Sequence, residues 1–305
     1  MNIKTKAHLG LLGTNIFFAI NLSTVKYLTG NHFMQPFGMN VIRVGVSAIL
    51  FWLLFLVKPV TKRIDRADVP RFILCALTGI AINQMLFLKG LSLTYSIHAV
   101  LLMLTTPILI TIIAAWLLKE RIGFYKVIGL GLGISGAVLL ITSGKNSGDG
   151  DNILLGDLLI LINAIAYTFY FILVKPLMLK YNPVQVIRIV FSIGFLMVLP
   201  FGWNEFSAID WQSFGRLEFT CLGLIVIGGT FLAYLFNVYG IKILGASMAG
   251  TYIYSQPVFA AIIAMIFLKE PLEPYKVIAA CFIFTGVYLC NKKISNDSIL
   301  FGKNG

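Results

Sequence analysis

The chain has 305 residues, of which 58% are hydrophobic and 12% are charged, and its formal net charge is +12 at pH 7. This apolar content is too high for the surface of a soluble protein and indicates an integral membrane protein. The basic residues are spread along the chain rather than gathered in one patch, which argues against nucleic acid as a partner.

The predicted elements are membrane-spanning helices. A helix that crosses the hydrocarbon core needs roughly 20 mostly apolar residues, because only intrahelical hydrogen bonds satisfy its backbone there. Ten stretches qualify, and in chain order they lie near Ala7–Leu28, Pro36–Val57, Pro70–Leu91, Tyr95–Leu118, Gly123–Thr142, Ile153–Leu173, Pro183–Trp203, Leu217–Ile241, Gly245–Leu268 and Glu273–Asn291. The connections between them are too short to form extramembrane domains, so the predicted fold is all-α and lies in the lipid bilayer.

The distribution of Lys and Arg predicts the orientation of these helices. With the N-terminus inside, about sixteen basic residues fall on the cytoplasmic side and about six on the other side. Lys4 and Lys6 precede the first apolar run, but Asn15 and Asn21 interrupt it, which favours a retained span over a signal peptide. We expect a multi-pass protein of the cytoplasmic (inner) membrane with both termini in the cytoplasm.

One phrase occurs twice in the sequence. "LTTPILITIIAAWLLKERIGFYKVI" fills positions 104–128, and "YSQPVFAAIIAMIFLKEPLEPYKVI" fills positions 254–278, with matched residues at a constant offset of 150. The chain therefore reads as two halves, 7–142 and 153–292, of five spans each. Because five is odd, the second half enters the membrane from the opposite side, which predicts two inverted five-helix repeats of the kind found in secondary transporters.

With these features the sequence resembles the EamA-type members of the drug/metabolite transporter superfamily. The resemblance rests on the duplicated five-span pattern, on a proline in spans four and nine, and on "LLKER" and "FLKEP" at the ends of those spans. It implies a transporter that exports amino acids, other metabolites or toxic compounds. Membership of the family does not fix the substrate or the oligomeric state.

Pro107 and Pro257 stand near the middle of spans four and nine, where each removes one backbone hydrogen bond. One interpretation is a structural kink, which membrane helices tolerate. The other is a hinge at the binding depth of a transporter, because Thr106 and Gln256 place polar groups beside the two prolines.

Helical spacing and the pairing of the two halves predict one central, solute-binding cavity. The residues assigned to it are Phe18, Asn21, Gln84, Thr106, Asn163, Tyr167, Tyr170, Tyr234, Asn237, Tyr252 and Gln256. For any single member, a hydrogen bond between two helices is the alternative. Such a cavity is aromatic, amide-rich and uncharged, which suits a small neutral, zwitterionic or amphipathic solute.

The charged residues of the spans carry further expectations. All acidic residues fall in connections or within about two turns of a span end, so no carboxylate is expected at mid-membrane as a proton relay. His98 is the only titratable candidate, and a packed histidine is the alternative. Arg43 and Arg188, just inside their spans, are expected to snorkel toward the interface.

Other function classes find little support in the sequence. "GLGISG" at 131–136 matches a dinucleotide-binding pattern but lies inside an apolar span, where Gly129, Gly133 and Ala137 instead form a small-residue face for helix packing. The sequence has no hydrolase, zinc-protease or P-loop motif, so we expect no catalytic residue, metal or cofactor. A membrane receptor or scaffold without transport activity is the alternative to a transporter.

Overall fold

The structure is a computed structural model of the chain. It describes residues 2–57, 63–106, 109, 124–143, 152–244, 252, 255–269 and 271–291. Across these residues the regular structure is helical, and no strand occurs among them. The all-α prediction is thereby confirmed for the described part of the chain.

The first half of the chain supplies the helices that precede residue 144. They are α1 (Ile3–Gly30), α2 (Pro36–Val57), the 3-10 turn η1 (Arg66–Asp68), α3 (Val69–Ala76), the π-helical segment η2 (Leu77–Ile82), α4 (Asn83–Leu93), α5 (Ser96–Met103) and α7 (Phe124–Ser143). Apart from Leu109, residues 107–118 of the predicted fourth span, with Pro107 among them, lie outside the described residues.

The second half follows in a similar order. It contains α8 (Ile153–Lys180), α9 (Pro183–Ser207), the 3-10 turn η4 (Trp211–Ser213), α10 (Arg216–Gly223), the π-helical segment η5 (Leu224–Leu232), α11 (Ala233–Leu244), α13 (Gln256–Ile263), the π-helical segment η6 (Ala264–Leu268) and α14 (Pro274–Asn291). Pro257 occupies the first turn of α13, where its missing N–H has no intrahelical partner to lose.

Six helices within the described residues are long and apolar enough to cross a membrane. They are Ile3–Gly30, Pro36–Val57, Arg66–Leu93, Ile153–Lys180, Pro183–Ser207 and Arg216–Asn237. Shorter apolar helices occupy Val127–Leu139, Val258–Leu268 and Pro274–Gly286, within the predicted fifth, ninth and tenth spans. The chain is therefore a multi-pass membrane protein, and six of the ten predicted spans occur as full-length membrane helices among the described residues.

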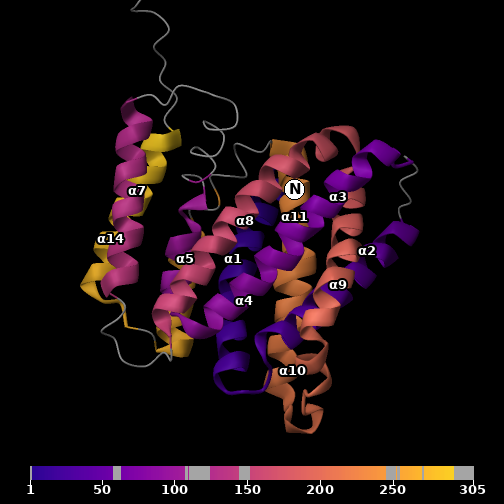
Figure 1. Cartoon of the computed structure of the whole chain (residues 1–305), viewed down its shortest axis with the longest axis horizontal. Coiled ribbons are helices and arrows are strands. Elements are labelled where there is room, and N and C mark those ends of the chain that lie inside the picture. Colours follow the sequence, from indigo (N-terminus) through magenta and orange to yellow (C-terminus); the bar gives the residue numbers. More distant parts are fainter. Residues whose placement is uncertain are drawn as a thin grey trace, which may run out of the picture.

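Helices that are distant in the sequence lie side by side in the bundle (Figure 1). α2 packs along α9, and α7 packs along α14 at one edge of the molecule. α1 lies against α11 and η5, while α8 lies against α4 and η2. Every one of these neighbours joins a helix from before residue 144 to a helix from after residue 152.

Close approaches between helices depend on small residues. A Cβ at Gly286 of α14 would lie 2.6 Å from the Gly129 carbonyl oxygen and 2.7 Å from the Gly133 nitrogen of α7. The predicted small-residue packing face of this span is thus confirmed.

At the start of α2, the Glu205 carboxylate of α9 accepts hydrogen bonds from the Phe37 and Gly38 N–H groups, at 2.6 and 2.9 Å. A carboxylate is favourable at this position because a helix N-terminus carries partial positive charge.

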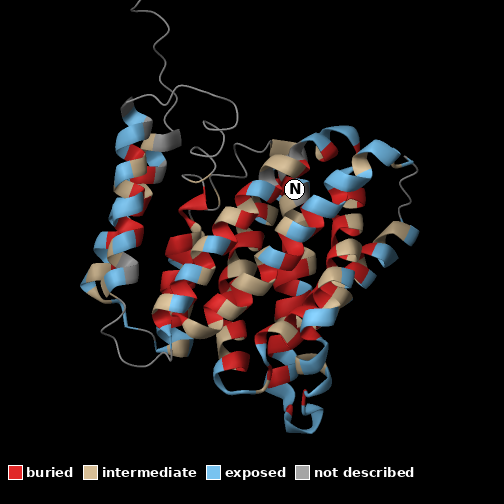
Figure 2. Ribbon diagram, viewed as in Figure 1, coloured by how far each residue is buried: buried red, intermediate tan, exposed pale blue. Residues whose placement is uncertain are grey.

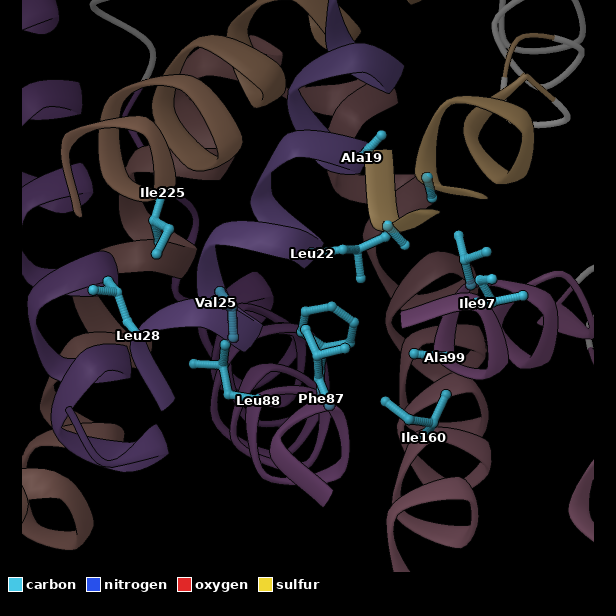
Figure 3. Packing of buried hydrophobic residues seen from close by; sticks show 14 of the residues in the cluster. Ala19, Leu22, Val25, Leu28, Phe87, Leu88, Ile97, Ala99, Ile160 and Ile225 are labelled. Carbon is cyan, nitrogen blue, oxygen red and sulfur yellow. The ribbon is translucent and has the colours of Figure 1, made fainter. Parts of the chain in front are cut away.

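The buried surface lies between the helices of the main bundle (Figure 2). One apolar cluster joins Leu22, Val25 and Leu28 of α1 with Phe87 and Leu88 of α4, as Figure 3 shows. Large apolar side chains also face outward, among them Leu56, Leu179, Phe201 and Phe267. In a membrane protein such exposed apolar side chains face lipid, so the outer surface agrees with the fold class.

Candidate functional site: a buried polar cluster around Tyr234

Tyr234 of α11 lies where helices of both halves of the chain meet. Its ring stands edge-on to the ring of Phe18 on α1, with a centroid separation of 6.4 Å and an interplanar angle of 85°. It meets the ring of Phe191 on α9 in the same way, at 5.2 Å and 87°. Edge-to-face contact is the geometry that aromatic rings prefer, so three helices are held together at this point.

Two tyrosines of α8 extend this aromatic group. The rings of Tyr167 and Tyr170 lie 5.8 Å apart, as expected for residues three positions apart on one helix face. Tyr170 belongs to the same buried apolar cluster as Phe191, and Tyr167 and Tyr234 both pack against that cluster. The ring of Tyr170 covers Gly79 in η2 so closely that a Cβ at position 79 would overlap it.

Two buried amides, one on α4 and one on α1, lie in the same region of the bundle. Gln84 of α4 is 3% exposed and its amide lies close to the Tyr234 hydroxyl, but neither amide atom has a partner at ordinary hydrogen-bond geometry among the described residues. Asn21 of α1 packs against Gly229 of η5, and its Oδ1 also lacks a described partner. A buried amide without a partner costs free energy, so these atoms mark a place where a polar ligand or water would be stabilised.

Arg43 of α2 is the charged member of the group. Its Nε donates a hydrogen bond to the Thr230 hydroxyl at 2.7 Å, and that hydroxyl donates to the Ile225 carbonyl at 2.9 Å. Arg43 is 5% exposed, its Nη1 has no partner among the described residues, and its partner Thr230 precedes Tyr234 by about one helical turn. The prediction that Arg43 snorkels to the interface is wrong, because the guanidinium turns inward between α2 and η5.

We call this group the Tyr234 cluster. Its members are Phe18, Asn21, Arg43, Gln84, Tyr167, Tyr170, Phe191, Thr230 and Tyr234. Six of them were assigned to the cavity from the sequence, whereas Arg43, Phe191 and Thr230 were not. An arginine eight residues into an apolar helix was the available signal, because ionisable residues inside membrane spans are rare and tend to be functional.

Three other predicted cavity residues have partners elsewhere. Asn163 of α8 donates to the Asn83 carbonyl of α4 at 2.6 Å, and the Asn83 amide donates back to the Asn163 carbonyl at 3.4 Å. Tyr252 pairs through its hydroxyl with His8 Nδ1 at 2.7 Å. Thr106 donates to the Met103 carbonyl of its own turn at 2.6 Å. In the described structure these side chains make bonds within or between helices.

The remaining predicted residues are only partly placed. Asn237 follows Tyr234 by one turn of α11 and is half-buried, as is Gln256 at the start of α13. Pro257 begins α13 rather than interrupting it, and Pro107 lies outside the described residues.

A second buried polar group contains His98, which is a packed histidine as one of the two interpretations of the sequence had it; its pairing with Asp157 was not predicted. Asp157, near the start of α8, lies 3.0 Å from His98 Nδ1 of α5, and both side chains are 0% exposed. The other carboxylate oxygen accepts a hydrogen bond from the Thr94 hydroxyl, and His98 Nε2 lies 3.1 Å from the Tyr275 hydroxyl of α14. Asp157 does stand near a helix end, as expected, but it is a buried carboxylate rather than an interfacial one.

The surface pockets do not coincide with the Tyr234 cluster. A pocket of about 500 Å³ lies between the α1–α2 and α9–α10 connections, with Gln35 and Ser213 in its lining. A second, of about 360 Å³, is lined by Lys26 and Thr94 among others. The first pocket is a surface depression between connections. The Tyr234 cluster is the better candidate for a binding site, because its guanidinium and amide groups are buried and some of their atoms have no hydrogen-bond partner among the described residues.

The fold and the cluster together define a polytopic α-helical membrane protein with a buried polar cluster between helices of its two halves. A sequence profile of the EamA-like transporter family matches residues 5–142 and again residues 154–292. The chain belongs to this family.

The relatives of the chain agree with that assignment. It is 27% identical over 244 residues to "Uncharacterized transporter YetK" of Bacillus subtilis, an alignment covering 80% of this chain and 74% of the relative. An Archaeoglobus fulgidus protein named "Uncharacterized transporter" is 24% identical over 282 residues, covering 92% and 96%. A solved structure titled "Crystal structure of protein" matches with a TM-score of 0.62 at 19% identity, over 92% of this chain and 95% of that one.

Proposed function

We propose that this protein is a secondary transporter that moves a small metabolite, such as an amino acid or another amphipathic solute, out across the cytoplasmic membrane by alternating access. The Tyr234 cluster carries the proposal, because aromatic, amide and guanidinium side chains from both halves of the chain converge there. Family membership supports transport as the activity.

We also propose that the two halves, 7–142 and 153–292, are inverted five-helix repeats. Paired packing supports this view, since α1 lies on α11 and η5 while its counterpart α8 lies on α4 and η2. A π-helical segment also occurs in both counterpart spans, η2 in the third and η5 in the eighth. Two near-equal halves of opposite orientation give two conformations that open one central site to either side.

The proposed orientation has both termini in the cytoplasm. The excess of Lys and Arg on that side supports it. Reporter fusions at residues 1 and 305 test it, and a periplasmic signal from either terminus would refute it.

Purified protein in liposomes tests the transport proposal. A panel of radiolabelled amino acids and other small metabolites is offered with and without an imposed pH gradient, and we expect movement of at least one solute in both conditions. Tyr234→Ala is expected to lower the rate by about tenfold or more, equivalent to about 1.4 kcal/mol. Tyr234→Phe, which keeps both ring contacts, tests whether the hydroxyl itself contributes.

Tyr288→Ala is the matched control, because Tyr288 is 65% exposed on α14. It is expected to leave the rate near that of the unchanged protein. If the panel contains no transported solute, the proposal fails in favour of a receptor or scaffold. If Tyr234→Ala transports at the unchanged rate, the cluster is not the solute site.

A further inference from the structure

We propose that Arg43 is an anion-recognition residue that pairs with the carboxylate of the transported solute. This inference rests on the proposed function and narrows its substrate class to small carboxylic acids that also carry a hydrogen-bond donor, such as amino acids and hydroxy acids. It replaces the expectation of an uncharged cavity.

The burial of Arg43 requires a compensating group. Residue 43 lies seven positions after the start of α2, about 10 Å along the helix axis at 1.5 Å per residue. At this depth an unpaired guanidinium is costly, and intramembrane arginines accordingly pair with anions or line water-filled sites. The ion pairs among the described residues join His98 to Asp157 and Lys180 to Asp65 and Asp68, and none of them includes Arg43.

The hydrogen bond from Nε to Thr230 occupies one edge of the guanidinium and does not involve Nη1. Nη1 is buried and has no partner among the described residues. A guanidinium presents its N–H groups in a planar fork that matches a carboxylate. Thr230 therefore orients Arg43, while the unpaired nitrogen is the group left for a ligand.

Arg188 of α9 provides an internal comparison, since "VIRI" at 186–189 answers "VIRV" at 41–44. The Arg188 guanidinium carbon lies 4.4 Å from the ring centre of Trp52 and 3.6 Å from that of Phe55. Aromatic faces attract a cation and partly compensate the loss of water. Arg188 is also buried, and its Nε and Nη1 have no hydrogen-bond partner among the described residues, so it is not the interfacial arginine that the sequence predicts. Its charge nevertheless lies over two aromatic rings, a compensation that no described contact gives to Arg43.

The rest of the cluster indicates what accompanies the carboxylate. Gln84 and Asn21 contribute buried oxygens without described partners, which can accept hydrogen bonds from an ammonium or hydroxyl group. The rings of Phe18 and Phe191 offer apolar surface to a small side chain. Because Arg43 is the single charged member of the cluster, a monovalent carboxylate matches it better than a phosphate dianion does.

Solute selectivity in liposomes tests this proposal. Each acid is paired with its amide, leucine with leucinamide and lactate with lactamide, and inorganic phosphate is included as a second anion. The unchanged protein is expected to prefer at least one acid over its amide by about tenfold or more. Arg43→Gln is expected to reduce that preference to about one, and Arg43→Lys to keep part of it. Arg188→Gln, the matched control, is expected to keep it in full.

Thermal stabilisation of the purified protein by the same compounds separates binding from transport and shows whether each variant is folded. If acids stabilise the unchanged protein but not a folded Arg43→Gln variant and no solute crosses the membrane, transport fails as a function and the Arg43 assignment stands. If solutes are transported and Arg43→Gln keeps the acid preference, the Arg43 assignment is overturned and transport stands. Stabilisation by phosphate but by neither acid overturns the carboxylate class. The absence of both transport and stabilisation overturns both proposals.

Discussion

Replacement of Asp157 by alanine is expected to destabilise the protein strongly. The carboxylate joins His98 of α5 through one oxygen and the Thr94 hydroxyl at the end of α4 through the other. His98 in turn meets the Tyr275 hydroxyl of α14. Asp157→Ala removes the shared acceptor and leaves two buried polar groups unpaired at the junction of four helices.

The size of the effect follows from burial. Asp157 and His98 are both 0% exposed, so solvent does not screen their attraction. Removing one partner of a buried pair typically costs about 3–5 kcal/mol. In a chain of this size each kcal/mol lowers the unfolding midpoint by roughly 2 °C, which gives a decrease of roughly 6–10 °C. Asp157→Asn keeps an oxygen that accepts the hydrogen bond from Thr94, and its NH₂ group can donate to His98 Nδ1 in the tautomer that is unprotonated there. The decrease in the unfolding midpoint is therefore expected to be about half as large.

The assay is thermal unfolding in detergent, followed by loss of the monodisperse peak in size-exclusion chromatography. Asp65→Ala is the control, because Asp65 pairs with Lys180 at 2.5 Å but is 60% exposed. Water screens such a pair, so its loss is expected to change the midpoint very little. A midpoint for Asp157→Ala equal to that of Asp65→Ala would refute the reasoning.

Three further substitutions test the packing and the site. Asn163→Ala removes the bond that the Asn163 amide donates to the Asn83 carbonyl, while the bond from Asn83 to the backbone carbonyl of residue 163 can remain; it is expected to cost about 0.6 kcal/mol, seen as a small fall in the unfolding midpoint with transport retained. Gly286→Ala forces α14 away from the backbone of α7 and is expected to cost about 1–3 kcal/mol, measured by the same assay. Gly79→Ala displaces the Tyr170 ring and is expected to reduce transport in liposomes more than Gly223→Ala, because a Cβ at Gly223 meets nothing within 4 Å.

The ends of a helix were predictable from the sequence where the apolar run stops at residues that commonly begin or end helices, such as proline. The bounds of α2, Pro36–Val57, match the predicted span because a proline opens it and a lysine and a proline follow it. The predicted end of span six at Leu173 is too early, since α8 continues to Lys180 through Pro176. An apolar run locates the part of a helix that contacts lipid, whereas the helix itself extends further into the polar interface.

The site was less predictable than the fold. Helical periodicity correctly placed Tyr167 beside Tyr170, because residues three positions apart lie on one face of a helix and at nearly the same depth. It failed for Tyr252, which contacts His8, ten residues and therefore about 15 Å along α1 from Phe18. The partners of Arg43 and Asp157 come from other helices, so their burial depends on tertiary packing that one helix pattern does not encode.

The buried charge of Arg43 links solute binding to conformational change in the proposed mechanism. A ligand shifts the equilibrium between two conformations only by the difference in its affinity for them. A carboxylate paired with Arg43 is attracted most strongly where the guanidinium is 5% exposed, as in this closed conformation, and less where water enters and screens the pair. The solute therefore stabilises the closed conformation relative to one open to either side. Without a solute, the closed conformation retains an unpaired buried nitrogen and is the costlier state, so a single arginine makes closure depend on occupancy.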